Sequence, residues 1–138
     1  MTVFPSVELK RLKKVSPGDL RLLWVNDWYD GPLEAVVDHQ GTRCLMVLHH
    51  EDLTADKPHR WVLFPLTPDQ LAEEMRWHEL YVKHVGDHWC FHDLDVVSHP
   101  PPESSRDVDA FQKLFRERDD IDLSSNTAAG WTDEMPKR

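Results

Sequence analysis

Histidine is the residue type whose number and spacing first suggest chemistry in this sequence. The chain contains nine histidines, and one stretch gathers several metal-binding residue types: His78, His84, His88, His92 and Asp93. A continuous helix would align His84, His88 and His92 on one face, because they are spaced four apart. Three such imidazoles are a ligand set that zinc accepts. Gly86 would interrupt this helix, although His88 and His92 would still share a face in a strand.

The spacing of these histidines matches no established metal signature, and the HExxH motif is absent. They can equally cap helices, make hydrogen bonds or lie at the surface, and general acid–base catalysis is a third interpretation. A zinc site built from His84, His88 and His92 is therefore the alternative hypothesis. The favoured interpretation predicts no cofactor.

A second group combines large aromatic rings with carboxylates. It begins in an apolar segment, runs through a turn and continues along the next segment: Trp24, Asp27, Trp28, Tyr29, Asp30, Glu34 and Asp38. Tryptophan and tyrosine contribute strongly to binding interfaces, and aspartate beside them suits an arginine side chain. These seven residues are the predicted partner-binding site. The alternative is that Trp24 and Tyr29 anchor the core while the aspartates shape the turn.

Recognised catalytic motifs are missing. The sequence has no GxSxG, no P-loop and no GxGxxG, and its five glycines are scattered. Carboxylate pairs among Asp27, Asp30 and Glu34 arise easily in an acidic chain, and Cys90 beside two histidines makes a weak nucleophile candidate. We therefore predict no catalytic residue and favour a protein that is not an enzyme.

Length and charge narrow the class further. The chain has 138 residues, which is the size of one domain, and a formal net charge of -9. This charge argues against direct binding to nucleic acid, because such affinity comes from Lys and Arg neutralising phosphates.

No apolar run approaches the roughly 20 residues of a membrane span, and no signal peptide is recognisable. With only Cys44 and Cys90, a disulfide framework is excluded, so we expect reduced thiols and a cytoplasmic location.

Short apolar segments separated by turns predict an antiparallel sheet. The expected strands cover residues 20–26, 33–39, 43–49 and 60–66. A helix is predicted over residues 68–84, with Thr67 as its N-cap and Gln70 completing a capping box. We expect its stripe of Leu71, Met75, His78 and Val82 to pack on the sheet.

The remaining sequence suggests less regular structure. Residues 1–97 are expected to form the compact domain, with an ambiguous strand over 87–97. Residues 98–106 are expected to form a proline-rich linker. A short amphipathic helix is predicted over 107–118 and a disordered tail over 119–138. The short helix would dock on its own domain, join two copies into a homo-oligomer, or enter a groove of another protein.

One resemblance adds to this description. The run Asp27-Trp28-Tyr29-Asp30-Gly31-Pro32-Leu33, followed by Trp77-His78-Glu79-Leu80 and His84-Val85-Gly86, resembles a pattern in small uncharacterised bacterial or phage proteins. It covers roughly residues 20–90. The resemblance implies a compact bacterial or phage domain and no particular activity.

Together these observations predict an α+β protein: a small antiparallel sheet, open or barrel-like, packed on one main helix, plus a short C-terminal helix. We expect an acidic module that binds a protein with a basic patch and blocks or regulates it, as an inhibitor, antitoxin or immunity protein does. The alternative is a small metal-dependent enzyme or metal-binding domain that uses the histidines between His78 and Asp93. Neither interpretation involves a membrane.

Overall fold

The structure of the protein is a computed structural model. The structure describes residues 7–28, 32–49, 59–84, 113–114, 116–118, 121–134 and 136. The predicted strand at 87–97 and the predicted linker at 98–106 lie outside these ranges. Within them, no helix is both long enough and apolar enough to cross a membrane.

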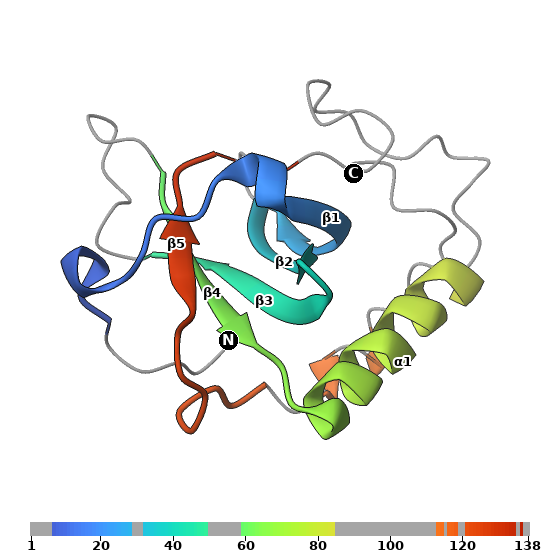
Figure 1. The fold of residues 1–138 in the computed structure, drawn as a ribbon. Coiled ribbons are helices and arrows are strands. Elements are labelled where there is room, and N and C mark those ends of the chain that lie inside the picture. The colour runs from blue at the N-terminus through green and yellow to red at the C-terminus, as the bar shows by residue number, and fades with distance from the viewer. Residues whose placement is uncertain are drawn as a thin grey trace.

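Five antiparallel strands form one sheet in the order β1-β2-β3-β4-β5 (Figure 1). Their bounds are β1 Leu20–Trp28, β2 Pro32–His39, β3 Thr42–Leu48, β4 Trp61–Pro65 and β5 Gly130–Thr132. Two short 3-10 turns, η1 (Leu9–Arg11) and η2 (Pro17–Asp19), precede the sheet. The α+β class and the four predicted strands are confirmed. The barrel-like form is not supported, because β1 and β5 are the two ends of an open sheet.

The turn between β2 and β3 fixes the register of this hairpin. His39 pairs with Thr42, and the two residues between them have positive φ, 51° at Gln40 and 94° at Gly41. Two such residues match the right-handed twist of the flanking strands. Asp38 supports the turn by accepting a hydrogen bond of 3.3 Å from the Gly41 amide.

The apolar core lies over the central strands. Every residue from Cys44 to Leu48 is buried, as is every residue from Trp61 to Phe64. These runs are apolar on both faces, so residues from the N-terminal segment, β1 and the C-terminal segment cover them: Leu9, Val15, Leu22, Val25 and Leu123. Of the described residues in the helix α1 (Pro68–His84), none belongs to this apolar cluster.

The last strand comes from the segment that we predicted to be a disordered tail. β5 pairs with β4, and the Ala129 amide donates a hydrogen bond of 2.8 Å to the Leu63 carbonyl oxygen. Leu123 is fully buried in the core. The prediction for 119–138 is therefore wrong for these residues, and the compact domain does not end at residue 97. The polar composition of this segment indicated disorder, but its Leu123 is buried and its backbone pairs with β4.

The helix α1 (Pro68–His84) has the predicted bounds, and its capping box is confirmed. The Thr67 amide donates to Gln70 at 2.9 Å, and the Gln70 amide donates to the Thr67 hydroxyl at 3.2 Å. The helix lies beside the sheet and alongside the segment around residue 118 (Figure 1).

The side of α1 that faces inward differs from the predicted stripe. Met75 is 44% exposed, whereas Glu74 and Trp77 are buried and His78 is half-buried. The stripe is therefore rotated from the predicted one and contains a carboxylate and aromatic rings. The reason is that the inner side of α1 meets polar partners, whereas the apolar core is already covered by other segments.

Candidate functional site

The predicted aromatic–acidic group is only partly visible in the structure. Trp24 is 7% exposed, and its ring stacks on His78 with centroids 4.4 Å apart and planes 9° from parallel. Trp24 therefore joins the β1 strand to α1, and its ring does not form an open surface. For Asp27 and Trp28 only the strand backbone is described, while Tyr29 and Asp30 lie outside the described ranges.

The two remaining members of that group have partners in the sheet. Asp38 forms an ion pair of 3.1 Å with Arg43 on the neighbouring strand. Glu34 is half-buried and accepts a hydrogen bond of 3.4 Å from the Asn26 side chain. Binding of a partner by this group stays a prediction, but Glu34 leads to a polar network that the sequence did not single out.

The histidine cluster is not brought together in the part of the chain that the structure describes. His84 contributes only its backbone, at the last residue of α1, while His88 and His92 lie outside the described residues. His78 stacks on Trp24. Among the described residues, no group of three His, Cys, Asp or Glu side chains is placed to hold a metal ion. The zinc hypothesis therefore stays a prediction about side chains beyond these ranges.

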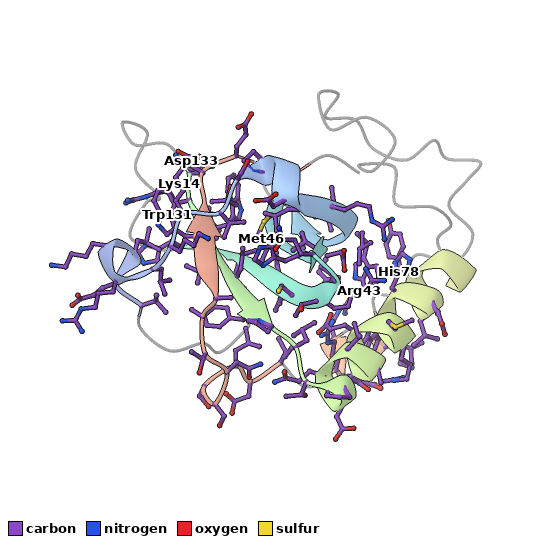
Figure 2. The ribbon with its side chains drawn as sticks, viewed as in Figure 1. Lys14, Arg43, Met46, His78, Trp131 and Asp133 are labelled. Carbon is purple, nitrogen blue, oxygen red and sulfur yellow. The ribbon has the colours of Figure 1, made fainter. Side chains whose placement is uncertain are left out.

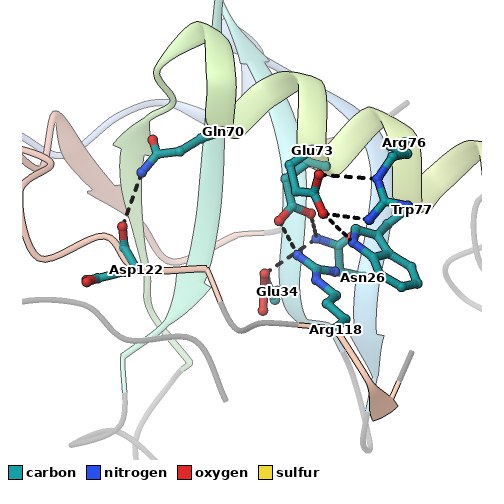
Figure 3. Close-up of polar contacts among 9 residues, drawn as sticks. Asn26, Glu34, Gln70, Glu73, Arg76, Trp77, Arg118 and Asp122 are labelled. Carbon is teal, nitrogen blue, oxygen red and sulfur yellow. Dashed lines mark hydrogen bonds and ion pairs between the residues drawn. The ribbon is translucent and has the colours of Figure 1, made fainter. Parts of the chain in front are cut away.

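Glu74 on α1 is the centre of a buried polar network that includes Asn26 on β1 and Arg118 in the C-terminal segment. Figure 3 labels these two partners. One carboxylate oxygen, Oε1, pairs with the Arg118 guanidinium. The other, Oε2, accepts a hydrogen bond of 2.9 Å from Asn26 on β1. Only 1% of the Glu74 side chain and 10% of the Arg118 side chain are exposed. Both carboxylate oxygens are thus satisfied, which a buried charge requires.

Trp77 forms a wall next to this pair. The central guanidinium carbon of Arg118 lies 5.5 Å from the ring centroid, and that of Arg76 lies 4.7 Å away. These are cation–π distances. The indole Nε1 donates a hydrogen bond of 2.9 Å to Glu73, which also binds Arg76 through two contacts of 2.8 and 3.2 Å. Figure 3 shows these side chains converging from successive turns of α1.

The hydrogen bonds and charges around Glu73 lower the pKa of its carboxyl group. The hydrogen bonds from Arg76, together with that from Trp77, lower the pKa of the Glu73 carboxyl below its ordinary value, and the nearby Arg118 charge acts in the same direction. Hydrogen bonds from Ser124 likewise lower the pKa of Asp122. Both groups therefore keep their negative charge well into mildly acidic solution.

An open hollow of about 460 Å³ lies beside the network. Its lining comes from the first turns of α1 and from the C-terminal segment: Asp69, Gln70, Glu73, Glu74, Arg118, Ile121 and Asp122. Four carboxylates and one guanidinium give this lining a formal charge of -3. A hollow of this size and sign suits a cationic side chain, because opposite charges attract most strongly where water is partly excluded.

Two side-chain amides attach the C-terminal segment to α1 beside the hollow: those of Gln70 and Asn126. Their amide groups exchange hydrogen bonds of 2.8 and 3.0 Å. Asn126 also donates to the Pro65 carbonyl oxygen at 2.9 Å, and Gln70 donates to the Asp122 carbonyl oxygen at 3.2 Å. The C-terminal segment is therefore positioned against α1 by side-chain amides.

Sequence reasoning missed the central residues of this hollow. Glu74 lies in mid-helix beside Glu73, where a solvent-exposed face is the ordinary expectation. Arg118 ends the segment predicted as an amphipathic helix, of which residues 113, 114 and 116 have helical backbone. Nothing in the spacing connects residue 74 with residue 118, since their contact depends on the path of the C-terminal segment.

Comparisons with known proteins give no further assignment. No family model matches the sequence, and neither the curated proteins nor the solved structures contain a match to it. The resemblance to small bacterial or phage proteins stays a prediction, and the function has to be argued from the residues themselves.

Proposed function

We propose that this protein is an acidic binding module that blocks or regulates a partner protein by engaging a basic segment of that partner in the hollow beside α1. The observation that supports this most directly is the -3 formal charge of the lining. A cytoplasmic location belongs to the same proposal.

The outer carboxylates are placed to meet an incoming cation. Asp69 and Asp122 are exposed and come from different segments on the rim of the hollow. Glu73 is also exposed, but it already binds Arg76. Asp69 and Asp122 therefore offer the accessible negative charge that would attract a basic partner and set its orientation.

The predicted aromatic–acidic group meets this hollow at one end. Asn26, which binds Glu74, directly precedes Asp27, and the backbone of Asp27 pairs with that of Glu34. A partner lying along the hollow would therefore approach the strands β1 and β2 where Asn26 and Glu34 lie. This proximity links the two acidic groups into one proposed recognition surface.

A binding assay with a labelled arginine-rich peptide tests the proposal. The double variant Asp69→Asn/Asp122→Asn removes two charges from the rim and should weaken binding about tenfold, which corresponds to about 1.4 kcal/mol. Fluorescence anisotropy at constant ionic strength measures the dissociation constant. A lysine-rich peptide of equal charge reports how far the guanidinium shape contributes.

The matched control is Asp19→Asn/Glu134→Gln, which removes the same charge from two exposed residues outside the hollow, one in η2 and one just after β5. It should change the affinity less than about twofold, because distant surface charges are screened. Equal weakening by both double variants would mean that the peptide senses only the overall charge, and the proposal would then be wrong.

A further inference from the structure

We infer that the deep part of the hollow is an arginine-binding site, and that in this structure the chain's own Arg118 occupies it. The segment around residues 113–118 would then be an internal competitor, and an arginine of a partner would replace Arg118 on Glu74. The inference rests on the proposed function only in taking the competing arginine to belong to a protein partner.

The groups around Arg118 form a site built for a guanidinium. Glu74 supplies a buried carboxylate, and the hydrogen bond from Asn26 to its second oxygen fixes its orientation. Trp77 supplies an aromatic face 5.5 Å from the guanidinium carbon. A planar guanidinium both stacks on a ring and donates to a carboxylate, whereas the ammonium of lysine is a compact, strongly hydrated charge.

Among the described residues 113–114 and 116–118, Arg118 is the one whose side chain is mostly buried. Lys113, Leu114, Arg116 and Glu117 are all exposed, and Arg118 is the first described residue of the segment to be mostly buried. Leu114 exposes 39% of its surface although it is apolar. The described residues before Arg118 therefore make little apolar contact, and we infer that loss of the Glu74 pair would release them.

Displacement would exchange one ion pair for another of the same kind. The partner's guanidinium would form the contact with Glu74 that Arg118 gives up, so the buried carboxylate would never be left unpaired. Asp69 and Asp122 at the rim would attract the incoming charge before this exchange. The segment around residues 113–118 would then be released, which gives the protein a change of shape that follows partner binding.

The variant Arg118→Ala empties the proposed site and allows a direct test. N-acetyl-arginine amide should raise the unfolding midpoint of this variant in a saturable manner, because a ligand that binds only the folded state stabilises it. The native chain should show no such effect at the same concentrations. N-acetyl-lysine amide should bind Arg118→Ala at least about tenfold more weakly, since it lacks the planar fork.

Two controls make the result specific. Arg116→Ala removes the same charge from an exposed residue of the same segment and should leave the chain insensitive to arginine amide. Adding Glu74→Gln to Arg118→Ala should abolish the stabilisation. If Arg118→Ala is unfolded in buffer, arginine amide should restore its near-ultraviolet circular dichroism; failure to restore it would overturn the inference.

The remaining outcomes are also decisive. Equal stabilisation of the native chain and Arg118→Ala, or none in a folded Arg118→Ala, would contradict an arginine site. Saturable binding to Arg118→Ala combined with no hollow-specific effect in the peptide assay would support the site while removing the protein-partner function. The two proposals therefore fail separately.

Discussion

At the scale of single residues, the main feature of this protein is a fully satisfied buried charge. Glu74 would be costly to bury alone, but Arg118 and Asn26 together occupy both of its oxygens. A helix position that normally faces water is thereby turned inward. Burial also determines the acidity of the Cys44 thiol, which lies in the buried strand β3.

Burial raises the pKa of the Cys44 thiol to about 11, and the negative charge of Asp38 adds to the effect. We expect its alkylation by iodoacetamide at pH 8 to be on the order of a hundredfold slower in the folded protein than in urea. A Cys90→Ser background isolates this thiol, and mass spectrometry measures the rate. Equal rates in both states would contradict the prediction.

The same shift gives a pH dependence of stability. The unfolded chain loses the thiol proton near its ordinary pKa of about 8.5, whereas the folded chain keeps it until about pH 11. The stabilising contribution is therefore complete below the unfolded pKa and is lost as the pH rises toward 11. Urea unfolding at increasing pH should show the native Cys44 chain losing more stability than Cys44→Ala.

At the scale of elements, α1 and β5 are held in different ways. α1 is attached by polar and aromatic contacts, including the stack of His78 on Trp24 and the pair formed by Glu74. β5 lies between β4 and the N-terminal segment, where the backbones of Lys14 and Trp131 form an isolated parallel β-bridge. The Val15 amide donates to the Trp131 carbonyl oxygen at 2.7 Å, so β5 has backbone partners on both sides.

The surroundings of three glycines predict how much stability each glycine-to-alanine substitution removes. At Gly130 a Cβ would lie 2.6 Å from a Val15 methyl carbon and 2.8 Å from the Lys13 carbonyl oxygen, so we expect a loss of about 1–3 kcal/mol. Gly41 has open space but a φ of +94°, and its substitution should cost about 1–2 kcal/mol. Gly18 has ordinary contacts, so its change should stay within about 0.5 kcal/mol.

The midpoint of urea unfolding measures the stability of each of the three glycine-to-alanine variants. The Gly18 variant serves as the matched control, since it makes the same chemical change without a close contact. A Gly130→Ala chain as stable as the Gly18→Ala chain would show that β5 moves away from the N-terminal segment at little cost.

At the scale of the whole molecule, charge is divided between two sides. Lys14 and Arg60 surround Trp131 at 5.4 and 6.0 Å, and Lys14 pairs with Asp133 at 3.1 Å. The acidic hollow lies beside α1. Figure 2 shows Lys14 and Trp131 on one side of the sheet and His78 on α1 at the other. A basic partner of the proposed kind would therefore meet more negative charge at the hollow beside α1 than at the edge around Trp131.

The C-terminal segment joins these two sides, so its removal should affect the whole fold. A chain that ends at Arg118 loses the buried Leu123 and the strand that covers β4. We expect it to be destabilised by more than about 3 kcal/mol and to associate through the uncovered edge. Urea unfolding and size-exclusion chromatography measure both effects.

A chain that ends at Pro136 is the control for this truncation, because it loses only Lys137 and Arg138. It should unfold at the midpoint of the full chain. If the chain ending at Arg118 also kept that midpoint, the ordered C-terminal strand would be contradicted and the tail predicted from composition would be restored.

The sequence by itself determined the local elements of this protein. Alternating and apolar runs placed β1 to β4, and Thr67 with Gln70 placed the start of α1, because these signals act within a few residues. The Gly41 turn belongs to the same class, since a positive φ favours glycine wherever it lies.

Only the tertiary structure decided what brings distant segments together. The pairing of β5 with β4 and the contact of Glu74 with Arg118 join residues more than 40 positions apart, and neither has a periodic signal. A buried ion pair uses the same residue types as a solvated surface, so the types alone do not indicate that Glu74 is buried. The polar composition of residues 119–138 likewise predicted disorder for the segment that contains the buried Leu123. The hollow therefore became recognisable only when the chain's path brought four carboxylates and one guanidinium into one lining.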